Sequence, residues 1–195
     1  MIDREVPGPT VSRGGFLHPV YVGLGSNLGD RLANLRAAAI ALASRDRVCV
    51  RRVSSVYETS PWGRVDQPWY LNAVVECASL LGPFELLATL KGIESDLGRL
   101  PGPRWGPRLI DLDLLVFKDL YLRSPTLVVP HRDLPRRAFV LAPLDELAPN
   151  VRLSDGSSVV SRLTTLAEEQ SVRRYGQPID DWLESASTDD CGREA

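Results

Sequence analysis

The spacing of apolar residues switches between two periods along the chain, and each period predicts one type of element. Alternation with period two, or a short apolar run, predicts β-strands at residues 20–24, 48–57, 70–78 and 108–117. Apolar residues three and four positions apart predict helices, one beginning after Asp30 and one running from Pro83 to a natural cap at Gly98. The predicted order is β-α-β-β-α-β, the ferredoxin-like (split βαβ) sandwich of the α+β class.

The rest of the chain predicts C-terminal additions to a single domain. Further helices are expected at residues 136–147 and at about 159–170. Residues 1–18 are rich in charged residues, proline and glycine and predict a flexible extension, and the tail 176–195 is predicted to be disordered. Residues 19–175 are left as one domain, a length that suits one hydrophobic core.

The composition narrows the classes of partner. The chain has 195 residues with 44% hydrophobic and 25% charged positions, typical of a globular protein, and a net charge of −2, which argues against a general nucleic-acid or membrane-surface binder. No apolar run approaches a membrane span. The three cysteines are scattered, which favours a reducing cytoplasm. A cytoplasmic monomer acting on small molecules is therefore expected.

The strand at 108–117 carries two acids that share a face. Asp111 and Asp113 are two residues apart, which places their side chains on one face, ~6.6 Å apart along the strand. The apolar residues expected to face a core on the other side are Ile110, Leu112, Leu114 and Val116. Two unpaired carboxylates repel one another, which favours binding of a cation between them. Oxygen ligands favour magnesium over zinc. A solvated acidic face on an edge strand would give the same pattern.

An arginine-rich loop lies directly before this strand. Arg99, Arg104 and Arg108 have no partner evident in the sequence, and guanidinium groups suit phosphate oxygens. A solvated basic loop is the alternative, because nearly all basic residues of this chain are arginine. Arginines for phosphate beside carboxylates for magnesium are the two halves of a nucleoside triphosphate site.

Two further segments suggest ligand contacts. Tyr70 and Asn72 share a strand face, and a ring beside an amide suits a flat heteroaromatic ligand, although Tyr70 could instead pack in the core. The glycine-rich segment 23–30 lacks the lysine and spacing of a Walker loop. It predicts either a weak phosphate loop or a tight turn where the backbone closely approaches another part of the chain.

Several motifs occur together in one order. They are Gly25–Asp30, Tyr57–Gly63, Asp66–Ala73, Arg104–Asp113, Val129–His131 and Arg137–Phe139. Together they resemble the 6-hydroxymethyl-7,8-dihydropterin pyrophosphokinases, a family of folate-pathway enzymes. The resemblance covers about residues 21–172, and the string from Arg104 to Asp113 is its most specific part.

The resemblance implies a reaction and a set of site residues. It implies transfer of pyrophosphate from ATP, as co-substrate, to the hydroxymethyl group of the dihydropterin, with release of AMP. Two Mg²⁺ ions would be bound by Asp111 and Asp113. The residues implied to contact the pterin are Thr59, Ser60, Trp62, Tyr70, Asn72, Trp105, Asp111 and Phe139. Those implied on the ATP side are Glu94, Arg99, Arg104, Trp105, Arg108, His131 and Arg137, with Arg99 and Arg108 also catalytic.

Two other functions remain open at this stage. A nucleotidyl transferase can also carry paired aspartates on a ferredoxin-like sheet, but it would release pyrophosphate and keep the nucleotide on its product. A regulatory domain that senses a small molecule would not need the arginines beside the acid pair. The identity of the nucleotide product separates these possibilities.

Overall fold

A computed structural model of the chain describes residues 18–61, 66–100, 102, 106–166, 170–176 and 178–181. The strands are β1 (His18–Ser26), β2 (Val48–Val53), β3 (Val56–Thr59), β4 (Tyr70–Ser79), β5 (Asp111–Phe117), β6 (Leu122–Arg123), β7 (Val128–Val129) and β8 (Val172–Tyr175). The α-helices are α1 (Arg31–Ala43), α2 (Pro83–Asp96), α3 (Ala138–Leu147) and α4 (Val159–Leu166), and a 3₁₀ turn spans Leu134–Arg136.

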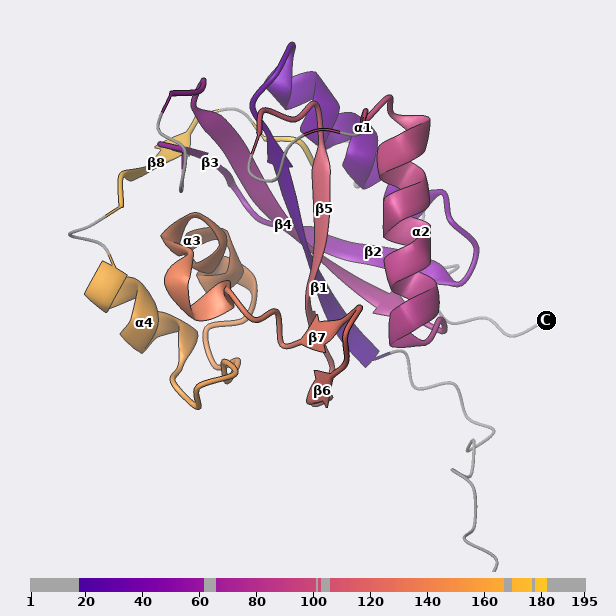
Figure 1. Ribbon diagram of the computed structural model, residues 1–195, viewed down its shortest axis with the longest axis vertical. Helices are drawn as coiled ribbons and strands as arrows, with labels where there is room; N and C mark the ends of the chain where they lie inside the picture. Colours follow the sequence, from indigo (N-terminus) through magenta and orange to yellow (C-terminus); the bar gives the residue numbers. More distant parts are fainter. Residues whose placement is uncertain are drawn as a thin grey trace, which may run out of the picture.

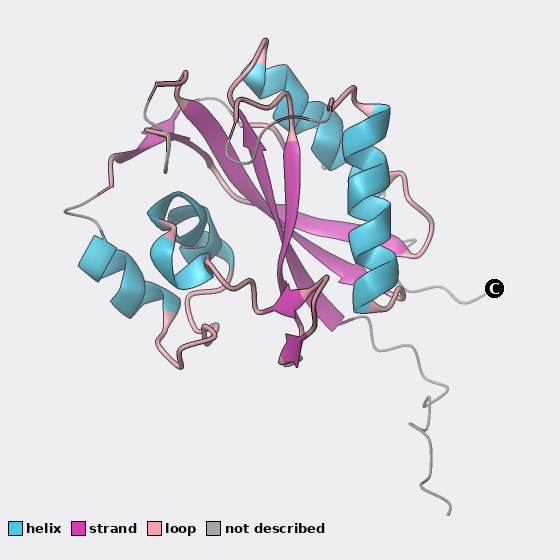
Figure 2. Ribbon diagram, viewed as in Figure 1, coloured by secondary structure: helices cyan, strands magenta, loops and turns pink. Residues whose placement is uncertain are grey.

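The main sheet lies between two layers of helices (Figure 1). Its strand order is β5-β1-β4-β3-β8, β2 also pairs with β4, and the pairs are antiparallel. Helices α1 and α2 cover one face, and α3 and α4 lie on the other (Figure 2). The predicted combination of helices and strands in one α+β fold is confirmed, and the structure shows the sheet to be antiparallel.

Each helix layer has its own hydrophobic core. The core beneath α1 and α2 includes Leu35, Leu42, Leu90 and Ile93, which are fully buried and recur at helical spacing. Asp30 caps α1 because its carboxylate accepts a hydrogen bond from Ala33 N at 3.0 Å. The sequence therefore specifies both helices by their apolar faces, and α1 also by its capped N-terminus.

The strand predicted at residues 48–57 is interrupted. β2 ends at Val53 and β3 begins at Val56, and both pair with β4. At the break, Ser54 Oγ accepts a hydrogen bond from Val74 N at 2.9 Å. A side-chain bond thus replaces a backbone ladder bond, which alternation of apolar residues alone does not reveal.

A bulge in β5 divides its side chains between the two cores. Tyr21 is aligned with Val116 but Val22 with Leu114, so that Leu115 is the extra residue. The prediction that Val116 faces the same core as Leu114 is therefore wrong. Val116 instead packs with Leu115 in the core beneath α3 and α4.

The C-terminal additions differ in their bounds from the sequence prediction. α3 begins at Ala138 after the 3₁₀ turn, and α4 is described to Leu166. Ile179 is fully buried in the core beneath α1 and α2, so the packed chain continues past residue 175. The predicted extension lies, apart from the first residue of β1, outside the described residues, and so do residues 182–195 of the predicted tail.

Two observations bear on the predicted compartment. No helix in the described part of the chain is long and apolar enough to cross a membrane. Cys77 is a buried free thiol, whereas Cys49 takes part in a disulfide. The reducing cytoplasm therefore stays a prediction.

Candidate active site

Two glycines of the central strand β1 form the floor of the main pocket. Gly25 is aligned with Asn72 on one side and with Asp111 on the other, and Gly23 is aligned with Asp113. Residues in register on adjacent strands share a face, so polar side chains flank a strip of sheet without side chains of its own. All five residues line the pocket.

The close approach predicted for the glycine-rich segment is found at Gly25. A Cβ atom at this position would lie 3.1 Å from Asn72 Oδ1, which is tighter than ordinary van der Waals contact. Absence of a side chain at Gly25 thus leaves both room for a ligand and room for the Asn72 amide. Of the two interpretations left open, the structure supports the close backbone approach.

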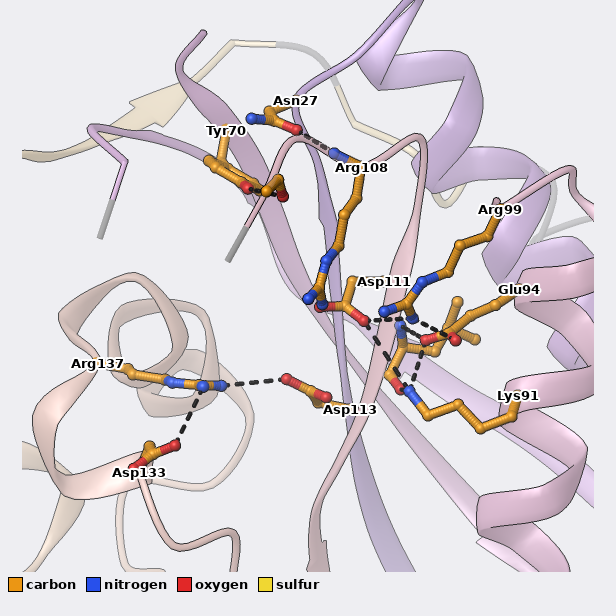
Figure 3. A network of polar contacts seen from close by, with 12 residues as sticks. Asn27, Tyr70, Lys91, Glu94, Arg99, Arg108, Asp111, Asp113, Asp133 and Arg137 are labelled. Atoms are coloured by element: carbon orange, nitrogen blue, oxygen red, sulfur yellow. Dashed lines mark hydrogen bonds and ion pairs between the residues drawn. The ribbon is translucent and has the colours of Figure 1, made fainter. Parts of the chain in front are cut away.

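Asp111 is surrounded by cations (Figure 3). Its two carboxylate oxygens accept hydrogen bonds from Arg99 and Arg108, each at 2.6 Å, and Lys91 Nζ lies 3.9 Å away. Burial alone would raise the pKa of Asp111, but these three cations hold it below its usual range. The expectations of an unpaired carboxylate, and of arginines without partners at 99 and 108, are therefore wrong.

Asp113 forms the second half of the charged site. Its carboxylate lies 3.1 Å from Arg137 Nη1, while Arg137 Nη2 contacts Asp133 at 3.3 Å (Figure 3). The Arg137 guanidinium is also 5.8 Å from the ring centroid of Phe139. Arg137 therefore links the acid pair to an aromatic wall of the pocket.

Glu94 hydrogen-bonds to the backbone of the edge strand β5 and does not line the pocket. Its side chain is only 4% exposed and accepts hydrogen bonds from Leu112 N and Lys91 Nζ, both at 2.7 Å, besides its pair with Arg99. Lys91 also donates to Leu112 O at 3.0 Å. Leu112 lies between the two aspartates, so Lys91 and Glu94 fix the backbone that carries them.

The residues implied for a flat ligand come together in the same pocket. Thr59, Ser60, Tyr70, Asn72 and Phe139 all line the pocket. Asn72 Nδ2 donates to Thr59 Oγ1 at 2.8 Å, and the Tyr70 hydroxyl donates to Gly106 O at 3.4 Å. The amide and ring that were predicted to act together therefore do line one pocket.

Asn27 was missed as a site residue, although it lies within the glycine-rich segment. Its Oδ1 accepts a hydrogen bond from Arg108 N at 2.7 Å, and its own N donates to Arg108 O at 3.1 Å (Figure 3). These two bonds hold the backbone of Arg108. The sequence showed only an amide within a glycine-rich segment. It could not show the partner of that amide, because Arg108 is 81 residues away.

His131 lies near Asp113 without lining the main pocket. Its Nδ1 accepts a hydrogen bond from Asp133 N at 3.2 Å, and burial lowers its pKa. A neutral ring in this arrangement carries its proton on Nε2. The remaining predicted site residues, Trp62, Arg104 and Trp105, lie outside the described residues.

The donor set fits magnesium bound together with a phosphate ligand. Within the described residues, no group of three or more His, Cys, Asp or Glu side chains could hold a metal ion. Asp111 and Asp113 supply two hard oxygen donors, and magnesium commonly combines one or two carboxylates with water and substrate phosphates. The nearby guanidinium groups of Arg99, Arg108 and Arg137 match the remaining phosphate oxygens.

Fold and pocket together define a mixed α/β protein with a pocket lined by charged side chains on one face of an antiparallel sheet. The model of the 7,8-dihydro-6-hydroxymethylpterin-pyrophosphokinase family matches residues 21–149. The chain therefore belongs to this family, and the resemblance found in its motifs is confirmed.

Relatives of two kinds are similar to this chain. The 2-amino-4-hydroxy-6-hydroxymethyldihydropteridine pyrophosphokinase of Bacillus subtilis is 41% identical over 169 residues, covering 86% of this chain and 97% of that protein. The mitochondrial folate synthesis bifunctional protein of Arabidopsis thaliana is 48% identical over 130 residues, covering 67% of this chain. This chain spans only 23% of the length of that plant protein.

A solved structure shows the same fold. The crystal structure of wild-type Plasmodium falciparum HPPK-DHPS with STZ-DHP superposes with a TM-score of 0.63 at 14% identity. The match covers 80% of this chain and 44% of that one.

Proposed function

We propose that this protein transfers pyrophosphate from ATP to 6-hydroxymethyl-7,8-dihydropterin in folate biosynthesis, giving the dihydropterin diphosphate and AMP. The family and the names of the bacterial relatives support this activity. The observation that carries the proposal is the Asn72–Gly25–Asp111 row. In this row an amide that suits a heteroaromatic ring and a carboxylate that suits a metal lie on either side of a glycine.

Different pocket residues would bind the two substrates. The pterin ring would lie between Tyr70 and Phe139, with Asn72 and Thr59 hydrogen-bonding to its edge. Arg99, Arg108 and Arg137 would bind the triphosphate. The pterin hydroxyl oxygen would attack the β-phosphorus as the bond to the AMP oxygen breaks, so the protein acts by positioning and charge neutralisation.

Magnesium is the metal that the donor set supports, with Asp111 and Asp113 as its protein ligands and two ions as the proposed number. When bound, the metal would neutralise charge on the triphosphate. Arg99 and Arg108 would then exchange their carboxylate partner for phosphate oxygens. The pocket volume of about 110 Å³ is below the ~300–1,000 Å³ of small-molecule sites, which supports movement of these side chains on binding.

The strand order supports a finer assignment of the fold. Counting β2 and β3 as one interrupted strand, we assign the ferredoxin-like order to the four-strand core, with β8 added at the β3 edge. The predicted monomeric state stays a prediction.

The direct test is to identify the products. Purified protein with ATP, Mg²⁺ and 6-hydroxymethyl-7,8-dihydropterin should yield AMP and pterin diphosphate in equal amounts, measured by chromatography and mass spectrometry. Release of pyrophosphate with nucleotide retained on the pterin would show a nucleotidyl transferase. Binding of pterin without turnover would favour the sensing domain.

Replacing Tyr70 by alanine should weaken pterin binding roughly tenfold or more, with little change in ATP affinity. Ring stacking contributes ~0.5–1.5 kcal/mol beyond the buried area, and the truncation also removes that area. Tyr70→Phe is the matched control, because it keeps the ring and removes only the hydroxyl, which lies 3.4 Å from both Gly106 O and Gln67 Oε1. Titration calorimetry with each ligand alone measures both affinities. An equal loss for pterin and ATP would indicate a general structural role for Tyr70.

A further inference from the structure

The short segment 170–172 touches both walls of the pocket. Ser171 O accepts a hydrogen bond from Ser60 N at 3.4 Å, and Val172 begins β8 in register with Thr59. On the other side, the Gln170 side chain bonds to the backbone at the start of α3. These residues lie beyond residue 149, where the match to the family model ends.

Gln170 holds the backbone on both sides of Arg137. Its Oε1 accepts a hydrogen bond from Ala138 N at 3.0 Å, and its Nε2 donates to Arg136 O at 2.9 Å. α3 has no side-chain cap from its own N-cap residue, Arg137. Because the first N–H groups of a helix need partners from outside the helix, Gln170 acts as a cap supplied from 32 residues away.

The direction of two pocket side chains depends on this backbone. Arg137 and Phe139 both line the pocket and lie on either side of Ala138, the residue whose N–H the amide holds. The backbone of Arg137 is not helical (φ −117°, ψ 87°). The Arg137 side chain makes no capping hydrogen bond that would stabilise this conformation. A rotation there would move the guanidinium away from Asp113 and tilt the Phe139 ring.

We infer that Gln170 is a positioning residue for the reaction. Its amide fixes Arg137 against Asp113 and Phe139 against the pterin, while the following residue ties the same segment to the opposite wall at Ser60. The inference rests on the proposed function, because Arg137 and Phe139 are its triphosphate and pterin contacts. Gln170 itself does not line the main pocket.

The test compares Gln170→Leu with the unaltered protein. Leucine has a similar volume but cannot make either hydrogen bond. Losing both bonds frees the backbone on either side of Arg137, so we expect pterin affinity to fall roughly three- to tenfold. Direct pterin binding should be measured by fluorescence titration, together with the hydrogen exchange of the Ala138 amide, which should become faster. Gln170→Glu keeps the acceptor for Ala138 N and should restore slow exchange and part of the affinity.

A second variant separates positioning from general destabilisation. Leu163 packs against the core beneath α3 and α4, so Leu163→Ala should lower the melting temperature and leave pterin affinity unchanged. All measurements are made well below each melting temperature. Unchanged pterin affinity in Gln170→Leu despite faster Ala138 exchange would overturn the inference, as would an equal loss in Leu163→Ala. Failure of the unaltered protein to form AMP and pterin diphosphate would instead refute the proposed function.

Discussion

Replacing Asp113 by asparagine is expected to lower turnover on the order of a thousandfold or more, with little effect on stability. Under the proposed function Asp113 would hold a metal ion, and a bound metal ion supplies several kcal/mol of charge stabilisation, of which 1.4 kcal/mol corresponds to a factor of ten. The folded protein loses only the partly exposed pair with Arg137, worth about 0–1 kcal/mol. Rates of AMP formation and thermal unfolding measure the two effects. Near-normal turnover would rule out Asp113 as a metal ligand.

Asp111→Asn should also abolish turnover, but with a loss of stability. Its carboxylate accepts charged hydrogen bonds from Arg99 and Arg108, so we expect about 1–3 kcal/mol of destabilisation at neutral pH. The folded-state pKa of Asp111 is lowered, so its stabilising effect is present above the unfolded pKa and is lost as pH falls through the folded pKa. The stability difference between Asp111→Asn and the unaltered protein should therefore shrink in acid.

Replacing Gly25 by valine is expected to remove most pterin binding. A Cβ at Gly25 already lies 3.1 Å from Asn72 Oδ1, and the two further methyl groups of valine would project over the pocket floor. Overpacking of this kind typically costs about 1–3 kcal/mol of stability. Pterin titration and thermal unfolding of the purified variant measure both consequences.

The control for Gly25→Val is a second glycine substitution, Gly92→Ala on α2. A Cβ at Gly92 would meet nothing within 4 Å, so this change should stabilise the protein by about 0.5–1 kcal/mol and leave turnover unaffected. Normal pterin affinity in Gly25→Val would show that the strip over β1 is not where the ring binds.

Local periodicity was sufficient to predict what depends on neighbouring residues. Asp111 and Asp113 do line one pocket because side chains on a strand repeat every second residue, and Gly98, with φ +86°, does terminate α2 in the left-handed conformation. The bulge at Leu115 changes that period within a single strand, and no feature of the local pattern announces it.

The sequence pattern could not predict contacts between segments that are far apart in the chain. The arginines at 99 and 108 were correctly associated with the acids, but as partners of phosphate rather than of Asp111 itself. Asn27 and Gln170 act through backbone atoms 81 and 32–34 residues away, respectively. A backbone partner has no identity that a sequence motif could show, so only the folded chain reveals these two residues.

The contacts of Lys91 and Glu94 with Leu112 have a second consequence, which concerns strand pairing between two molecules of this protein. β5 is an edge strand, and an edge with free N–H and C=O groups can template pairing with a strand of another molecule. At Leu112 both groups are already occupied by side chains of α2. The charged pair thus blocks strand addition at Leu112, so the backbone between Asp111 and Asp113 is protected from pairing with another molecule.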